Sequence, residues 1–243
     1  MVDALFAEPR LAAVYDALDP DRSDLDAYSA IAEELGATRV VDVGCGTGAF
    51  ACLLAGRGKA VVGVDPAAAS LEVARGKPGA DAVHWVHGDA TALPALRADL
   101  ATMTGNVAQV FVDDRRWDET LAAVGGSLRV GGWLVFETRD PARQAWRHWT
   151  HDHTCHHADI PGIGRVETWV ELTSVAFPLV SFQTTFVFAA DGATLRSQST
   201  LRFRDRDEIA GSLERAGFRL EDVRDAPDRP GLEMVFLAVR AER

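Results

Sequence analysis

The sequence has 243 residues, a net charge of −11 and an ordinary globular composition, in which 47% of the residues are hydrophobic and 25% are charged. These values exclude a disordered chain, and a chain of this length buries a core without disulfides or structural metals. The negative charge and the lack of a stripe rich in lysine and arginine argue against nucleic acid as a partner.

Neither the cysteines nor the apolar segments indicate an oxidising compartment or a membrane. The three cysteines include no Cys-x-x-Cys pair, so we expect neither a disulfide framework nor a thiol redox centre. Residues 1–10 lack the apolar core of a signal peptide, and no stretch approaches the length of a membrane span. We therefore expect a cytoplasmic protein without a membrane partner, with a homo-oligomer left open.

The first part of the chain alternates between helix and strand patterns. We expect helices at residues 25–35, 47–57, 66–75 and 117–124, the last of them ending at Gly125-Gly126. Short apolar runs between them predict strands at residues 39–43, 60–64, 83–86, 100–102 and 133–137. Strands that alternate with helices at this spacing form a parallel sheet through right-handed crossovers.

After residue 140 the strand patterns follow one another directly. Strands are predicted at residues 165–173, 179–189 and 195–203, with Asp191-Gly192 as the hairpin turn between the last two. Asp205 and Glu208 form the capping-box pattern of a helix that stops at Gly217. The strands expected at residues 218–224 and 232–240 are near enough in sequence to pair antiparallel.

Residues 40–50 read VVDVGCGTGAF, a buried strand followed by a glycine-rich turn and a helix. Gly44, Gly46 and Gly48 let the backbone turn sharply and approach a ligand, beside the unpaired N–H groups of the helix N-terminus. Asp65 ends the second strand, where an acid holds the hydroxyls of a ribose. These features predict an adenosine-bearing cofactor. The loop also satisfies the looser G-x-G-x-x-A fingerprint of a dinucleotide site.

Three further features favour S-adenosylmethionine over NAD. Asp42 stands two residues before Gly44, His87-Gly88-Asp89-Ala90 follows the third strand, and the sheet ends in the antiparallel pair. With these features the chain resembles the class I S-adenosylmethionine-dependent methyltransferases of the small-molecule type, over about its whole length. VVDVGCGTG resembles motif I of that family, VVGVDPAAASL motif II, HGDATALP motif III, and LRVGGWLVFET the late strand.

The resemblance implies an α/β fold with a doubly wound, mostly parallel seven-stranded sheet whose last strand is antiparallel. It also implies an antiparallel sheet inserted before the last helix. We expect residues 1–140 to form the Rossmann-like cofactor domain and residues 141–204 the inserted lid. Residues 205–243 would then supply the last helix and the strand pair that complete the first domain.

The same resemblance assigns cofactor contacts to the motif residues. They share a position near the carboxyl ends of the strands and are Asp42, Gly44, Cys45, Gly46, Gly48, Asp65, Pro66, Asp89 and Ala90. Within that set the glycines line the methionine side, Asp65 binds the ribose, and the Asp89 carboxylate accepts from the adenine amino group. Asp42 would order the loop from below. Any of these acids can instead serve as a cap or turn residue.

Two other segments contribute candidates for the cofactor site. Thr104, Gly105 and Asn106 follow the fourth strand, where small residues and an amide suit a polar ligand or, equally, a plain turn. Gln109 lies just beyond them under the same two alternatives. Tyr15 belongs to an N-terminal segment that closes over the cofactor in related methyltransferases, although a packed surface tyrosine fits the sequence as well.

Residues 147–157 read RHWTHDHTCHH and hold five of the seven histidines. One interpretation makes His148, His151 or His153 a general base for the methyl acceptor, because histidine titrates near neutrality. Another is a metal site that includes Cys155. The ligand spacing is loose and no second cluster completes a set, so we favour a solvated lid and expect no metal. Neighbouring tryptophans would wall an acceptor pocket or form the core of the insert.

The sequence thus predicts methyl transfer from S-adenosylmethionine to a small-molecule acceptor, with no general base identified. A non-catalytic ligand-binding or interaction module that keeps the fold is the alternative. The complete glycine loop, Asp65 and Asp89 favour the enzyme. An NAD-dependent oxidoreductase is disfavoured because the chain has no Tyr-x-x-x-Lys pair.

Overall fold

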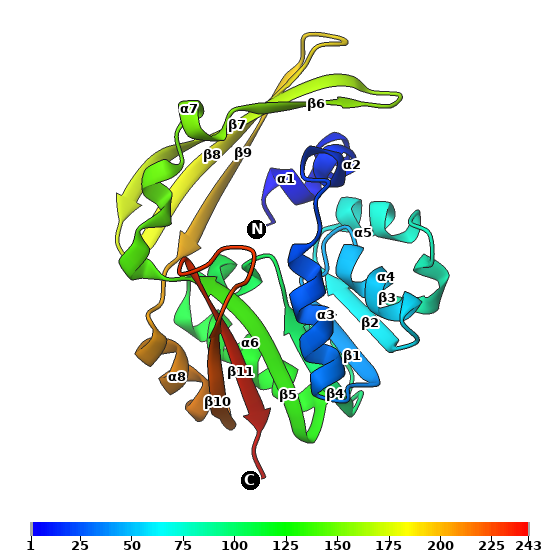
Figure 1. Cartoon of the computed structure of the whole chain (residues 1–243), viewed down its shortest axis with the longest axis vertical. Coiled ribbons are helices and arrows are strands. Elements are labelled where there is room, and N and C mark those ends of the chain that lie inside the picture. Colours follow the sequence, from blue (N-terminus) through cyan, green and yellow to red (C-terminus); the bar gives the residue numbers. More distant parts are fainter. Residues whose placement is uncertain (1, 243) are drawn as a thin grey trace.

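The computed structural model describes residues 2–242, which form two β-sheets and the helices around them (Figure 1). In the larger sheet the strand order is β10-β11-β5-β4-β1-β2-β3. The bounds are β1 Arg39–Val43, β2 Ala60–Asp65, β3 Val83–His87, β4 Ala98–Met103, β5 Leu128–Arg139, β10 Phe218–Asp225 and β11 Glu233–Arg240. β11 runs antiparallel to β5 and β10, and the other pairs are parallel. The predicted sheet is confirmed.

Helices cover both faces of this sheet. α3 (Asp24–Glu34) and α4 (Ala49–Gly56) bury apolar side chains on one face, among them Tyr28 and Phe50, whose ring centroids lie 6.3 Å apart. α6 (Asp114–Ser127) and α8 (Arg206–Arg215) pack on the opposite face. α8 begins with the predicted capping box of Asp205 and Glu208. Burial of these two apolar layers is the main force that holds the helices on the sheet.

Several predicted helix boundaries differ from the observed ones: α4 begins at Ala49 rather than at residue 47, and α6 begins at Asp114 rather than at residue 117. Gly125 and Gly126 lie inside α6, although neither is required by packing, since a Cβ on Gly125 would make only ordinary contact with the Phe218 ring at 3.5 Å. Burial of the apolar side of α6 outweighs the low helix propensity of the two glycines. The turn into the next strand comes later, and β5 itself passes through Gly131, whose φ is 72°. The helix predicted from Pro66 begins two residues later as α5 (Ala68–Arg75).

The N-terminal segment contains two helices that the sequence did not predict. α1 spans Ala4–Ala7, and α2 spans Pro9–Leu18 with proline at its first position, where the missing N–H costs nothing. None of the helices between residues 2 and 242 is both long and apolar enough to cross a membrane.

The smaller sheet, which we call the lid sheet, contains four antiparallel strands in the order β6-β7-β8-β9. Their bounds are β6 His156–Ile160, β7 Gly164–Ala176, β8 Leu179–Phe188 and β9 Thr194–Arg202. The last three were predicted. The short β6 was missed, because its residues HHADI show no strong strand pattern.

One face of the lid sheet packs on the N-terminal helices. Val166, Phe186 and Phe188 lie in a buried cluster with Leu11 and Val14 of α2. We call this face, which carries Val166 of β7, the inner face. The opposite face carries the β7 residues that alternate with it, and we call it the outer face. Figure 1 shows α1 and α2 between the lid sheet and the rest of the molecule. The lid sheet is therefore held over the larger sheet through these helices.

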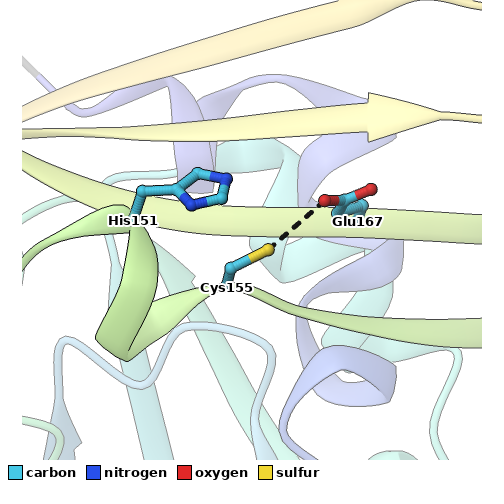
Figure 2. A group of neighbouring side chains, drawn as sticks. All are labelled: His151, Cys155 and Glu167. Atoms are coloured by element: carbon cyan, nitrogen blue, oxygen red, sulfur yellow. Dashed lines mark hydrogen bonds between the residues drawn. The ribbon is translucent and has the colours of Figure 1, made fainter.

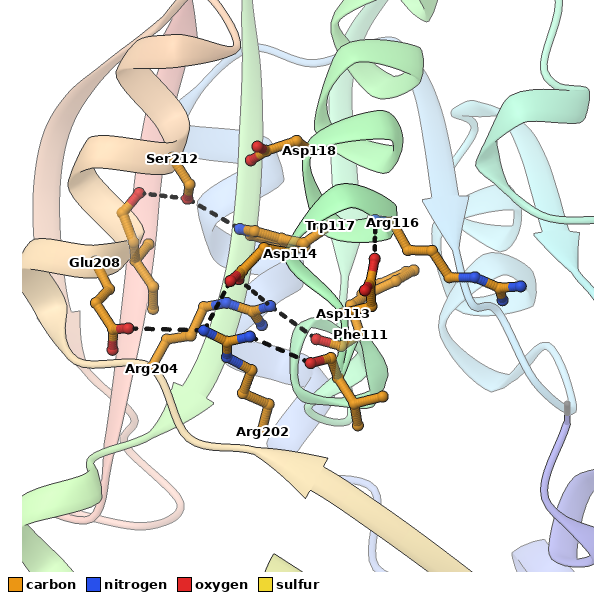
Figure 3. A network of polar contacts seen from close by, with 12 residues as sticks. Phe111, Asp113, Asp114, Arg116, Trp117, Asp118, Arg202, Arg204, Glu208 and Ser212 are labelled. Carbon is orange, nitrogen blue, oxygen red and sulfur yellow. Dashed lines mark hydrogen bonds and ion pairs between the residues drawn. The ribbon is translucent and has the colours of Figure 1, made fainter. Parts of the chain in front are cut away.

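A network of arginines fastens the end of the lid sheet to α6 (Figure 3). Arg202 and Arg204 both reach Asp114, at 2.9 and 3.2 Å from its two carboxylate oxygens. Arg204 is buried, donates to the carbonyl of Phe111 at 2.8 Å, and lies over the ring of Trp117. Because Arg204 has a hydrogen-bond acceptor and an anionic partner, its burial is tolerated.

Candidate functional site

The glycine loop between β1 and α4 has a backbone that only glycine adopts easily. Gly44, Gly46 and Gly48 have φ values of 71°, 53° and 77°. A Cβ on Gly44 would lie 2.6 Å from the side chain of Val107, and one on Gly48 would lie 2.5 Å from Trp85. The loop is thus held between two side chains from other elements, with its N–H groups at the carboxyl edge of the sheet.

Asp65 connects the glycine loop to the end of β2. Its Oδ2 accepts from the amide of Gly46 at 2.8 Å, and its Oδ1 accepts from the amide of Ala67 at 2.7 Å. The side chain is buried, and burial raises the pKa of Asp65. An anion in this position fixes the loop and still offers its remaining lone pairs to a ligand hydroxyl.

Asp42 lies on β1 below the glycine loop, but its observed hydrogen bond goes elsewhere. It accepts from the hydroxyl of Thr102 on β4 at 3.0 Å, while its Oδ2 has no hydrogen-bond partner within residues 2–242. Burial raises the pKa of Asp42 to about 7. The residue that bonds directly to the loop is Asp65, and Asp42 supports it only through the sheet.

The end of α2 lies against the glycine loop. The hydroxyl of Thr47 donates to Asp16 at 2.7 Å, and Lys77 also pairs with Asp16. Tyr15 is mostly buried beside Phe6, with ring centroids 5.7 Å apart, and burial raises the pKa of its phenol. The segment that carries Tyr15 therefore reaches the predicted cofactor loop. Asp16 was not singled out from the sequence, although it neighbours Tyr15.

The other motif residues lie along the same edge of the sheet. Asp89 is exposed after β3, where its Oδ1 accepts from the amide of Thr91 at 2.9 Å, and Ala90 beside it is buried. The carbonyl of Pro66 lies 3.2 Å from a ring nitrogen of His87. The sulfur of Cys45 lies next to Gly63 of β2, 3.1 Å from where a Cβ on that glycine would be, and burial raises the pKa of its thiol.

The loop after β4 carries the remaining predicted residues and is fixed by an acid that sequence reasoning missed. Thr104 leads into Gly105 and Asn106, which have φ values of 73° and 61°. The amide of Asn106 donates to Glu137 of β5 at 2.7 Å, and its side chain donates to Glu233 of β11 at 3.2 Å. Burial raises the pKa of Glu137 to about 7. In the sequence, Glu137 could have been noticed as an acid at the end of an otherwise apolar strand.

Arg139 stands between the two sheets at the end of β5. It donates to the side-chain oxygen of Gln109 at 3.0 Å and pairs with Glu233 at 3.7 Å. Its guanidinium lies 5.5 Å from the ring centroid of Trp149, which packs with Phe182 in the core beneath the lid sheet. Arg139 thus marks where the lid meets the carboxyl edge of the larger sheet.

Several buried polar atoms at this edge have no hydrogen-bond partner within residues 2–242. They are Asp42 Oδ2, Asn106 Oδ1, Gln109 Nε2 and Glu137 Oε2. An unpaired buried polar atom costs free energy, and natural structures contain few of them. Their concentration beside the glycine loop is typical of a place where a ligand or ordered water supplies the missing contacts.

The histidines of the lid segment are not part of this arrangement. His148, His151 and His153 are exposed, and their side-chain contacts are with one another, with Thr150 and with neighbours on the lid. The ring of His151 packs on Trp169, which lies on the outer face of β7. The structure therefore does not bring these three candidates together with the glycine loop.

Comparison with known proteins agrees with this arrangement. Residues 40–132 match the family model described as a methyltransferase domain. Uncharacterized methyltransferases of Mycobacterium bovis and Mycobacterium tuberculosis are 33% identical to the chain over 104 residues, which are 43% of this chain. The chain spans about half the length, 52%, of these curated relatives.

Solved structures share the fold over nearly the whole chain. The CcbJ methyltransferase of Streptomyces caelestis superposes with a TM-score of 0.80 at 19% identity, covering 99% of this chain and 100% of that one. The sugar N-methyltransferase KedS8 of Streptoalloteichus gives 0.77 at 20% identity, covering 95% and 92%. CalS10 of Micromonospora echinaspora, an amino pentose methyltransferase with S-adenosylmethionine bound, gives 0.72 at 23%, covering 94% and 95%.

Proposed function

We propose that this chain, a class I S-adenosylmethionine-dependent methyltransferase in its fold and in the domain of residues 40–132, transfers a methyl group to a small-molecule acceptor. The observation that carries the proposal is the contact between Asp65 and Gly46, in which a buried carboxylate fixes the glycine loop. Such a contact would hold the loop amides and the carboxylate in place so that both bind the same ligand.

The residues at the carboxyl edge fit S-adenosylmethionine. The glycine loop would hold its methionine part, Asp65 its ribose, and Asp89 with Ala90 its adenine. The bound cofactor supplies an electrophilic methyl group on a sulfonium. The chain contributes alignment and a site shielded from water, which is what an in-line displacement needs.

The acceptor would enter between the carboxyl edge and the inner face of the lid sheet. Arg139 and Trp149 meet there, and the α2 segment with Tyr15 borders the glycine loop. Glu137 is a positioning residue in this proposal, because it holds the loop at Asn106 on which the two ligands would meet. The similar proteins include sugar and amino pentose methyltransferases, which supports a small polar acceptor rather than a polymer.

Calorimetry with S-adenosylhomocysteine and with NAD tests the cofactor. We expect binding of the first and none of the second, and the reverse result would refute the proposal. Release of S-adenosylhomocysteine on incubation with a panel of small amines and alcohols tests catalysis. Binding without release on any acceptor would favour the alternative, a non-catalytic module that keeps the fold.

A further inference from the structure

Three side chains with metal-ligating atoms meet on the outer face of the lid sheet (Figure 2). They are His151 and Cys155 from the α7 segment and Glu167 from β7, and their ligand atoms all lie within 4.8 Å of one another. The group is exposed and lies on the face opposite to the one that packs on α1 and α2. It therefore plays no part in the proposed cofactor site.

The local structure brings these residues together in two ways. α7 spans His151–Thr154 with Cys155 as its C-cap, so His151 and Cys155 are four residues apart and point to the same side. β6 and β7 pair antiparallel with His157 directly opposite Glu167. Residues opposite each other in a ladder share a face of the sheet, so His157 lies beside Glu167 on the outer face.

A hydrogen bond already joins two members of this group. The thiol of Cys155 donates to Glu167 Oε1 at 3.3 Å, so the sulfur and the carboxylate oxygen face each other. A divalent cation between them would take the place of the thiol proton, which passes into solvent when the metal binds.

We propose that His151, Cys155 and Glu167 bind one Zn²⁺ ion on the outer face of the lid sheet. One nitrogen, one sulfur and one oxygen ligand are the set that this borderline-soft cation accepts, and a water or His157 would complete a tetrahedron. The ion would clamp α7 onto β7. It would thereby stabilise the segment that carries Trp149, whose ring faces Arg139 at the junction of the two sheets.

Titration of the full chain, reduced and treated with chelator, tests this site. Zn²⁺ should bind in a one-to-one ratio near neutral pH, and Co²⁺ should give a thiolate-to-cobalt absorption band. Cys155→Ser should abolish that band, and His151→Ala or Glu167→Gln should each weaken Zn²⁺ affinity by at least about tenfold.

His156→Ala is the matched control, because His156 neighbours the cluster in sequence but lies opposite Thr168, on the other face of β6. It should leave the affinity unchanged. Because all the altered side chains are exposed, circular dichroism should show that each variant is folded. No cobalt–thiolate band, or equal Zn²⁺ affinity of Cys155→Ser and the parent, would overturn the proposal. The proposal would also be overturned if Zn²⁺ binding were lost in a His148→Ala/His153→Ala variant but kept in Cys155→Ser.

Discussion

Replacement of Asp65 is the sharpest test of the proposed cofactor site. Asp65→Ala removes the acceptor of two backbone hydrogen bonds, at 2.8 and 2.7 Å, together with the proposed contact to the ribose. Hydrogen bonds to a charged group contribute about 1.5–3 kcal/mol each. We count only the ribose contact in the binding equilibrium, so S-adenosylhomocysteine should bind about 10- to 150-fold more weakly.

The free energy of unfolding of Asp65→Ala should fall by less than the loss of two hydrogen bonds to backbone amides would give. Burial raises the pKa of Asp65, so the folded chain bears a desolvation cost that the substitution also removes. Asp65→Asn keeps the shape but offers one acceptor oxygen in place of two, so one of the two amides would face an amide donor. It should therefore bind more weakly than the parent as well.

Isothermal calorimetry measures the affinity, and urea unfolding shows whether each variant is folded. Asp81→Asn is the control, because it removes one negative charge from an exposed position outside the glycine loop. It should leave the affinity within about twofold of the parent. A folded Asp65→Ala protein that binds S-adenosylhomocysteine as tightly as the parent would refute the assignment of Asp65 to the cofactor.

Three further substitutions probe the loop, the buried acid and the lid. Gly48→Ala should destabilise the fold by about 1–3 kcal/mol in urea unfolding, because its methyl group would clash with Trp85. Burial raises the pKa of Glu137 to about 7, above its value near 4 in the unfolded chain, so the folded chain holds the proton more tightly. The unfolding free energy should then fall as the pH rises from about 4 to 7, and less steeply in Glu137→Gln. Trp149→Ala should spare cofactor binding but lower methyl transfer, while Trp169→Ala, on the outer face, should affect neither; equal turnover of the two variants would contradict this acceptor site.

The sheet was predictable because its signals are local. Each parallel strand is a short apolar run, and each is followed by a turn or a helix with its own stop signal, as at Asp205 and Gly217. Gly125-Gly126 misled the prediction, since a glycine pair is read as a helix end from the sequence alone, whereas the buried side chains of α6 carry the helix through both residues. α2 was missed although Pro9 marks its first turn. The contact of that helix with the site joins Asp16 to Thr47, which are 31 residues apart in the sequence, so no local pattern revealed it.

The polar residues of the site also divide into those that a local sequence signal reveals and those that only the fold brings together. The position of Asp65 beside the glycine loop could be predicted from its place after a strand, because strand ends of a parallel sheet meet at one edge. Glu137 and Glu233 are 96 residues apart in the sequence and come together only through the pairing of β5 with β11 and through Asn106. The third ligand of the lid cluster was hidden for the same reason. Glu167 lies beyond the histidine-rich stretch and joins it only because β7 folds back on β6.

The two sheets divide the chemical tasks of the molecule. The larger sheet contributes backbone amides and buried acids at its carboxyl edge, with orphaned polar atoms that a ligand would satisfy. The lid sheet contributes aromatic side chains on its inner face, and Trp149, in the segment before α7, lies beside them with Arg139 of the edge over its ring. Because the lid rests on α1 and α2, and α2 is bonded to the glycine loop through Asp16, a ligand in the loop and the position of the lid should affect each other. That coupling would let the loaded cofactor site set the shape of the acceptor site, without any residue shared by the two.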